Sequence, residues 1–202
     1  GRPWHEAVVY ELHVGAFTEA GTFASAEQRL AHLADLGVTA IELMPVADFA
    51  GARNWGYDGV LAFAPDSTYG RPEDLKALVD SAHRHGLMVL LDVVYNHFGP
   101  EGNYLPRIAP PFFTERHQTP WGAGINYDDA HSRTVRDFVV ANARYWLREY
   151  DLDGLRLDAI DTIADDTRPD IVEELADWVR RTTAAKRHVH LVLENNAHQA
   201  RY

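Results

Sequence analysis

The sequence predicts an α/β fold built on a parallel β-sheet. Short apolar runs rich in β-branched residues alternate with segments whose apolar residues recur at helical spacing. This alternation is typical of parallel strands joined by right-handed helical crossovers. The loops from strand to helix are long, at 45–70 and 95–131, whereas the returning loops are short. Long loops at the carboxyl ends of strands favour a barrel, although an open doubly wound sheet also binds ligands there.

Five apolar runs are the predicted strands. Each is short and continuous, which is expected of parallel strands covered on both faces. The runs cover residues 8–14, 38–44, 87–94, 153–158 and 189–194.

Four segments of helical period lie between these runs. In the first, Ser25 and Gln28 have capping-box spacing, and Gly37 stands where a C-terminal glycine belongs. In the second, Pro72 opens the first turn and Gly86 ends the helix. The predicted helices cover residues 25–37, 71–86, 132–150 and about 170–186.

Composition limits the classes of function. The chain is 46% hydrophobic and 24% charged, as in ordinary globular proteins. Its formal net charge of -11 argues against nucleic acid or an anionic membrane as partner. The absence of cysteine excludes disulfides, thiolate metal sites and a cysteine nucleophile. No run of membrane-spanning length and no signal peptide is found, so we expect a cytoplasmic protein.

The sequence lacks a nucleotide-binding motif, and its two ends are abrupt. No G-x-G-x-x-G or phosphate loop follows the first predicted strand, which disfavours nucleotide binding. The chain opens at GRPWHEAVVY without methionine and stops soon after its last apolar run, so both ends are expected to be cut.

Polar and charged side chains gather at the carboxyl ends of the third to fifth predicted strands. Because the carboxyl ends of parallel strands share one face, we expect these side chains to converge there. They are Asp92, Asn96, His97, Arg156, Asp158 and Glu194.

Two carboxylates in this set suggest acid–base chemistry. Arg156 and Asp158 are two residues apart, so they point to the same side of the strand, and the guanidinium is expected to lower the pKa of Asp158. Glu194 follows an apolar strand, where burial would raise its pKa and keep it protonated as a general acid. One charged and one neutral carboxyl group, about 5 Å apart, are used in retaining glycoside hydrolysis. The alternatives are a structural ion pair and a loop-capping glutamate.

Aromatic residues on the long loops suggest the class of ligand. Such rings either stack on the apolar faces of sugars or pack the loops together, and Tyr57 is the best candidate for ligand contact. The aromatic residues are Trp55, Tyr57, Tyr95, Tyr104, Phe112, Phe113 and Trp121. A metal-dependent hydrolase using Asp92, His97 and Asp158 is disfavoured, because no H-x-H pair stands at a strand's carboxyl end. We therefore predict neither a metal nor a cofactor.

Three stretches resemble a known family. DVVYNH at 92–97, GLRLDAID at 154–161 and LVLEN at 191–195 are similar to the first three signature regions of the α-amylase superfamily of glycoside hydrolases, in the same order. The resemblance implies that Asp158 is the nucleophile, Glu194 the acid/base and Arg156 the residue that orients Asp158.

The same resemblance implies a substrate-binding set. Asp92 is then a structural member of the site, and His97 and Tyr57 contact the sugar in the subsite of the cleaved bond. Trp55 and Asn96 complete the expected set.

Longer stretches resemble one group within the superfamily. YELHVGAFTEAGTF and ELMPVADFAGARNWGYDGV are similar to maltooligosyltrehalose trehalohydrolases. This implies hydrolysis of the α-1,4 bond next to the trehalose end of maltooligosyltrehalose or a related α-glucan. Glycogen branching enzymes share several of these elements, so branching is an alternative, as is a non-catalytic sugar-binding remnant.

The resemblance also predicts the architecture. Residues 1–202 are expected to form the N-terminal part of an α-amylase-type catalytic barrel, a partial TIM (β/α)8 barrel with about the first five of eight strands and long loops on the C-terminal face. The rest of the barrel, the fourth signature region with its His-Asp pair and the flanking β-sandwich domains are expected to be absent from these residues. We expect the chain to be inactive alone.

Overall fold

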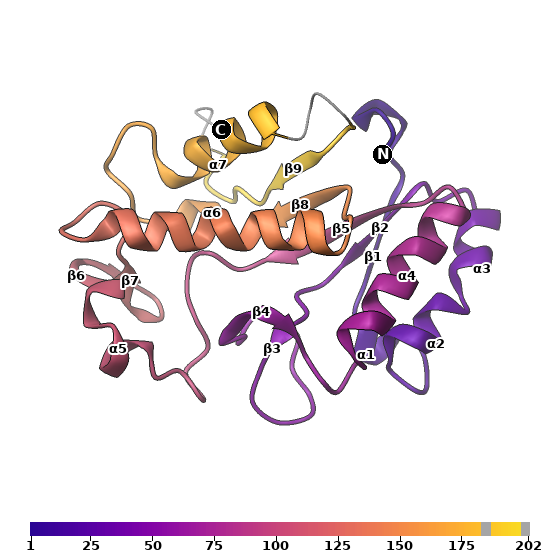
Figure 1. Ribbon diagram of the computed structural model, residues 1–202, viewed down its shortest axis with the longest axis horizontal. Coiled ribbons are helices and arrows are strands. Elements are labelled where there is room, and N and C mark those ends of the chain that lie inside the picture. Colours follow the sequence, from indigo (N-terminus) through magenta and orange to yellow (C-terminus); the bar gives the residue numbers. More distant parts are fainter. Residues whose placement is uncertain (183–186, 199–202) are drawn as a thin grey trace.

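The computed structural model describes residues 1–182 and 187–198, and its centre is a five-stranded parallel sheet (Figure 1). The strand order is β1-β2-β5-β8-β9, and every neighbouring pair is parallel. The five predicted strands and the α/β class are therefore confirmed, with strands slightly shorter than their apolar runs. The strands are β1 (Val9–Leu12), β2 (Ala40–Leu43), β5 (Met88–Val93), β8 (Gly154–Leu157) and β9 (His190–Leu193).

The main helices lie between the strands in sequence, as expected of β/α units. The α-helices are α1 (Val14–Phe17), α2 (Phe23–Glu27), α3 (Leu30–Asp35), α4 (Pro72–Arg84), α5 (Leu105–Ile108), α6 (Ser132–Glu149) and α7 (Ile171–Thr182). Short 3-10 turns are η1 (Trp4–Glu6), η2 (Pro110–Phe112) and η3 (Ile160–Thr162). The last four residues of the predicted 170–186 helix lie outside the described residues. Within the described residues, no helix has both the length and the apolar character needed to cross a membrane.

The first predicted helix is divided in two and begins earlier than expected. Thr22, not Ser25, is its N-cap: the Ser25 amide donates to Thr22 Oγ1 at 3.2 Å, and the Thr22 amide donates to Ser25 Oγ at 3.1 Å. Ser25 is thus the third residue of a capping box that opens three residues upstream. The sequence pattern identified the right kind of cap at the wrong position.

The two long loops contain structure that the apolar pattern did not predict. The first carries an antiparallel pair, β3 (Ala47–Asp48) and β4 (Leu61–Pro65), and the second carries α5, η2 and the hairpin of β6 (Phe113–Thr119) and β7 (Gly122–Ile125). Both insertions follow carboxyl ends of sheet strands and appear in the lower half of Figure 1. These strands are short or largely polar, so they lack the continuous apolar run that marked the others.

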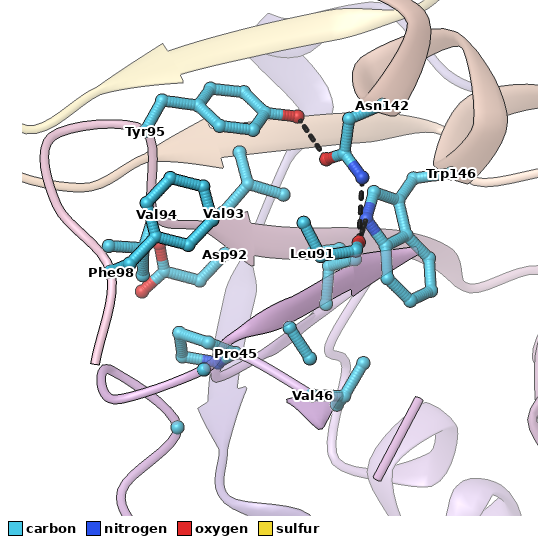
Figure 2. Close-up of a pocket in the computed structure, with 14 residues that line it drawn as sticks. Pro45, Val46, Leu91, Asp92, Val93, Val94, Tyr95, Phe98, Asn142 and Trp146 are labelled. Carbon is cyan, nitrogen blue, oxygen red and sulfur yellow. Dashed lines mark hydrogen bonds between the residues drawn. The ribbon is translucent and has the colours of Figure 1, made fainter. Parts of the chain in front are cut away.

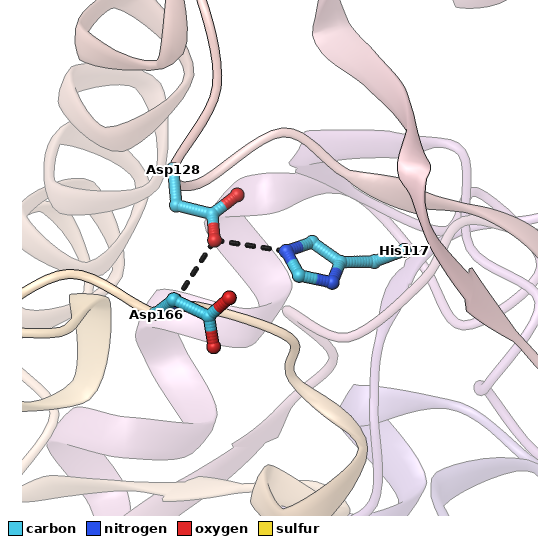
Figure 3. A group of neighbouring side chains, drawn as sticks. All are labelled: His117, Asp128 and Asp166. Carbon is cyan, nitrogen blue, oxygen red and sulfur yellow. Dashed lines mark hydrogen bonds and ion pairs between the residues drawn. The ribbon is translucent and has the colours of Figure 1, made fainter.

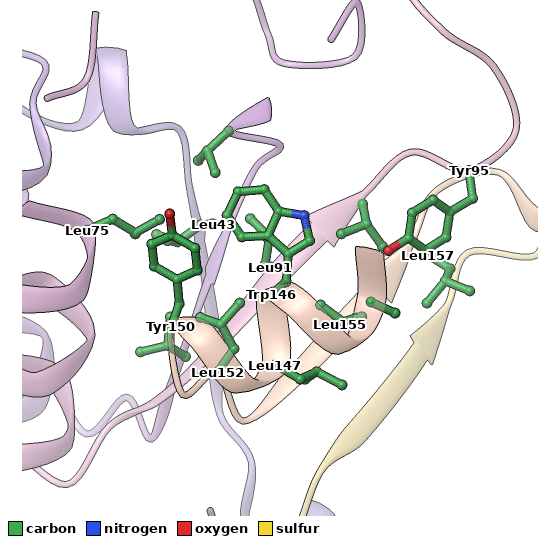
Figure 4. Packing of buried hydrophobic residues seen from close by; sticks show 14 of the residues in the cluster. Leu43, Leu75, Leu91, Tyr95, Trp146, Leu147, Tyr150, Leu152, Leu155 and Leu157 are labelled. Atoms are coloured by element: carbon green, nitrogen blue, oxygen red, sulfur yellow. The ribbon is translucent and has the colours of Figure 1, made fainter. Parts of the chain in front are cut away.

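Strand register separates the core face of the sheet from the site face. One row of leucines crosses all five strands. Three of its members, Leu43, Leu91 and Leu155, lie in the hydrophobic core together with Trp146 and Leu147 of α6 (Figure 4). Side chains alternate along a strand, so the neighbouring row, which includes Asp92 and Arg156, points to the opposite face. The leucine row is Leu12, Leu43, Leu91, Leu155 and Leu191.

At the amino end of the sheet, His83 contributes a pH-dependent contact. Its Nε2 lies 2.8 Å from Asp153 Oδ2, and this hydrogen bond raises the pKa of His83. A histidine whose pKa is raised in the folded state contributes stability below its unfolded pKa of about 6.5, and that contribution is lost as the pH rises through the folded value. We expect His83→Gln to lower the free energy of unfolding by about 1–2 kcal/mol at pH 6 and by clearly less at pH 9. Urea unfolding at both pH values checks this, and an equal loss at the two would contradict it.

Candidate active site

Arg156 is the centre of a cluster of three carboxylates. Its Nη1 donates to Asp92 Oδ2 at 2.6 Å and to Asp158 Oδ1 at 3.1 Å, and its Nη2 lies 3.0 Å from Glu194 Oε2. The Arg156 side chain is 15% exposed, and that of Asp92 is fully buried. The structure thus brings these four sequence-predicted side chains into direct contact.

The sheet sets this geometry. Asp92 in β5 and Arg156 in β8 are register partners. Asp158 and Glu194 each follow the last residue of a strand, yet the ladder continues to them: Asp158 N donates to Val93 O at 3.1 Å, and Glu194 N to Leu157 O at 3.0 Å. Parallel pairing therefore carries all four residues to the same edge and the same face.

A backbone amide also holds Glu194. Ala159 adopts a left-handed conformation, with φ 41° and ψ 50°, and its N–H donates to Glu194 Oε2 at 2.9 Å. The residue after Asp158 thus binds the second carboxylate, so the two are fixed relative to each other. A non-glycine residue in this conformation is uncommon and marks a constrained turn.

Asn96 holds Asp158 in place through hydrogen bonds from its side-chain amide. Its Nδ2 donates to both Asp158 Oδ2 and the Asp158 carbonyl, each at 2.8 Å, and its Oδ1 hydrogen-bonds His97 Nδ1. Asn96 is only 3% exposed. Asn96 was predicted to bind substrate, and in the structure its side chain hydrogen-bonds Asp158.

Tyr57 reaches the cluster from the first long loop, with its hydroxyl donating to Asp92 Oδ2 at 2.9 Å. Gly56 makes the turn possible: its φ is 104°, and a Cβ there would lie 2.1 Å from Pro45 O, so only glycine fits. Trp55, by contrast, is 77% exposed. The NWGYD stretch thus directs one ring into the cluster and leaves the other at the surface.

The charge balance of the cluster corrects one expectation. Burial raises the pKa of Asp158, and this outweighs the hydrogen bond from Asn96 and the charge of Arg156, which both lower it. The net direction is therefore up, whereas the sequence suggested that Arg156 would lower it. Burial likewise raises the pKa of Asp92 to about 7, against the contributions of Arg156 and Tyr57. One positive charge, that of Arg156, faces three carboxyl groups. The cluster therefore favours keeping one of these groups protonated near neutral pH.

The expected burial of Glu194 is also not found. Its side chain is 32% exposed, and β9 is half-buried along its whole length. The reason is topological: among the described residues, β9 is an outer strand of the sheet, with a neighbour only at β8.

A small cavity lies behind β5, next to Asp92 (Figure 2). Tyr95 Oη donates to Asn142 Oδ1 at 2.8 Å, and Asn142 Nδ2 and Trp146 Nε1 both donate to the Ala62 carbonyl, at 2.6 and 3.1 Å. These bonds join α6 to β4 behind the strand that carries Asp92. Tyr95 and Phe112 are buried, so they pack the loops, while Tyr104 and Trp121 are exposed.

A second cluster of potential ligands lies apart from the carboxylates. His117, Asp128 and Asp166 have ligand atoms within 4.8 Å of one another (Figure 3). Arg116 already contacts Asp166 at 2.9 Å and Asp128 at 3.4 Å, so a positive charge is present without a metal. In the part of the chain that the structure describes, Asp92, His97 and Asp158 do not form such a group.

Sequence reasoning missed one residue on the site side and one contact of a residue that it had named. Glu42, in β2, shares the face of Asp92, and its pKa is raised by burial while Arg156 lowers it. Glu42 could have been found from the sequence, because it is a charged residue inside an apolar run, and the same feature identified Arg156. Trp121 stacks on His97, with ring centroids 4.1 Å apart and planes at 3°. Nothing in the sequence indicated that contact.

Carboxylates gathered at the carboxyl edge of parallel β/α units are characteristic of the catalytic domains of barrel enzymes. Residues 13–111 match the family model described as the alpha amylase catalytic domain. The malto-oligosyltrehalose trehalohydrolase of Deinococcus radiodurans is 54% identical over 178 residues, which are 86% of this chain and 29% of that protein. The same-named protein of Saccharolobus solfataricus is 49% identical over 176 residues, 87% of this chain and 31% of that one.

A solved structure agrees with these matches. A Salmonella typhimurium protein described as a candidate alpha amylase superposes with a TM-score of 0.91 at 53% identity, covering 96% of this chain and 32% of that one. The chain thus belongs to the α-amylase family, and its sheet corresponds to part of the family's barrel. It spans about 30% of the length of these curated relatives.

Proposed function

We propose that this chain carries the nucleophile and the acid/base of a retaining α-glucan hydrolase that releases trehalose from maltooligosyltrehalose. Residues 1–202 then form the N-terminal part of the catalytic barrel, in a cytoplasmic enzyme of trehalose biosynthesis. The observation that carries the proposal is the guanidinium of Arg156 in contact with Asp92, Asp158 and Glu194 at once. The two named relatives support the choice of substrate.

In the first step, Asp158 attacks the anomeric carbon of the glucose on the non-reducing side of the scissile bond, while Glu194 protonates the departing oxygen of trehalose. A covalent glycosyl ester forms and the α-1,4 bond breaks. In the second step, Glu194 takes a proton from water, which attacks the same carbon and frees Asp158.

The supporting residues fix this arrangement. Arg156 and Asn96 direct the Asp158 oxygens, and the Ala159 amide directs Glu194. Tyr57, His97 and Trp55 complete the proposed sugar-binding surface, with Asp92 held under it by Tyr57.

The test is incubation of the full-length protein with maltotriosyltrehalose, followed by analysis of the products. We expect free trehalose and maltotriose, with the new anomeric centre formed in the α configuration. New α-1,6 linkages without trehalose would identify a branching enzyme instead. Binding without turnover would favour a sugar-binding protein.

Tyr57→Phe tests the proposed sugar-binding surface. The variant keeps the ring but removes the hydroxyl that donates to Asp92 Oδ2, so the buried carboxylate loses one of its partners. We expect kcat/KM for maltotriosyltrehalose to fall about 10-fold, with the melting temperature little changed. Steady-state kinetics and thermal unfolding would check this. An unchanged kcat/KM would show that the Tyr57 hydroxyl does not contribute to the reaction.

A further inference from the structure

The tip of the β6–β7 hairpin touches the candidate active site. Trp121 lies in the turn between the two strands, and its ring is parallel to that of His97, with centroids 4.1 Å apart and planes at 3°. His97 is 7% exposed, while Trp121 is 48% exposed. One face of the indole therefore covers the imidazole, and much of the tryptophan remains open to solvent.

A chain of contacts leads from this stack to Asp158. His97 Nδ1 bonds Asn96 Oδ1, which directs the other end of the amide, Nδ2, toward Asp158. An Asn side chain has one acceptor and one donor end, so the His97 contact selects the orientation in which the donor faces the carboxylate. The His97 ring can fix the orientation of the Asn96 amide only if the ring itself is kept in place.

The stack is not part of the hydrophobic core. Trp121 is outside the buried apolar cluster, and the turn is closed by its own hydrogen bonds: Trp121 N donates to Thr119 Oγ1 at 3.2 Å, and Thr119 Oγ1 to Gly122 O at 3.0 Å. These turn hydrogen bonds do not involve the indole ring. The ring contact that the indole makes is the stack on His97.

We propose that Trp121 is a positioning residue: its indole holds the His97 ring and, through Asn96, fixes the Asp158 carboxylate. The inference deepens the proposed function and rests on it only for the effect on turnover. It assigns the inserted hairpin a part in aligning the nucleophile.

The ionisation of His97 provides one readout. Burial lowers the pKa of His97, and the charges of Asp158 and Asp58 and a backbone hydrogen bond with Tyr57 oppose this. Loss of the indole would expose the ring to water, so its pKa should move up toward about 6.5.

The chain offers a matched control. Trp4 is 45% exposed and leans on another histidine, His190, with centroids 5.2 Å apart and planes at 48°. His190 lies in β9 and hydrogen-bonds the Arg2 carbonyl through Nε2. Trp4→Ala thus removes a similar half-exposed indole from a histidine outside the carboxylate cluster.

The experiment compares Trp121→Ala, Trp121→Phe and Trp4→Ala in the full-length protein. Proton NMR gives the position and titration of the His97 ring signal, assigned with His97→Gln, and the hydrogen-exchange rate of the Asn96 side-chain amide. In Trp121→Ala we expect the ring signal to lose its upfield stacking shift, its pKa to rise, and Asn96 amide exchange to accelerate about 10-fold. Trp121→Phe should restore most of the wild-type values, and Trp4→Ala should change none of them.

Kinetics add the effect on turnover. We expect Trp121→Ala to lower kcat about 10-fold with KM within about 2-fold of wild type, because a misaligned nucleophile slows chemistry more than binding. Unchanged Asn96 exchange in Trp121→Ala would overturn the inference, whatever the activity, and so would unchanged kcat in an active enzyme. If the wild-type protein releases no trehalose, the proposed function fails, and Asn96 exchange still decides this inference.

Discussion

Asp158→Asn is expected to lower the rate of maltotriosyltrehalose hydrolysis by at least about 10³-fold while leaving substrate binding largely intact. The amide has nearly the shape of the carboxylate, but its single oxygen can accept from only one of the two donors, Asn96 Nδ2 or Arg156 Nη1, which bind separate oxygens of Asp158. It cannot attack the anomeric carbon, because it lacks the negative charge of the nucleophile. Single-turnover kinetics and calorimetric binding measure the two effects separately.

Asp161→Asn is the matched control for this variant. Asp161 lies three residues further on, in η3. Among the described residues, the ion pairs of Arg156 are with Asp92, Asp158 and Glu194, so the same acid-to-amide change at Asp161 removes a charge without breaking one of them. We expect its turnover to stay close to wild type. Equal loss in both variants would point to a general electrostatic effect, and unchanged turnover in Asp158→Asn would remove Asp158 from the role of nucleophile.

The sheet and the carboxylate cluster were predictable because both depend on local patterns. Continuous apolar runs give strands, and parallel pairing then places residues such as Asp92 and Arg156 side by side at one edge. Arg156 and Asp158 are two residues apart, and this spacing predicted that they point to the same face of the sheet. No knowledge of distant contacts was needed for these steps.

What could not be predicted depends on tertiary contacts. The sign of the Asp158 pKa shift is set by burial, which is a property of the folded site and not of the two-residue spacing. The exposure of Glu194 follows from the outer position of β9. The support by Asn96 and the stack of Trp121 join segments that only the folded loops bring together.

Arg136→Met is expected to lower the free energy of unfolding by about 3–5 kcal/mol, because it leaves a buried carboxylate without its counter-charge. Arg136, in α6, is 8% exposed at its side chain, and its Nη1 lies 2.6 Å from Asp165 Oδ2, on a side chain only 2% exposed. Its Nε also bonds Glu174 Oε2 at 2.7 Å, and Nη2 bonds the Pro169 carbonyl at 2.9 Å. The guanidinium thus holds the segment between η3 and α7, which follows Asp158 in the chain.

Arg133→Met is the control, one turn earlier on the same helix. Arg133 contacts the same glutamate, at 2.6 Å from Glu174 Oε1, but its side chain is 59% exposed. Exposed pairs contribute about 0–1 kcal/mol, so burial and not pairing should separate the two variants. Denaturant unfolding measures both, and similar losses would contradict this account. Adding Asp165→Asn to Arg136→Met should recover part of the loss, since the double variant no longer buries an unpaired charge.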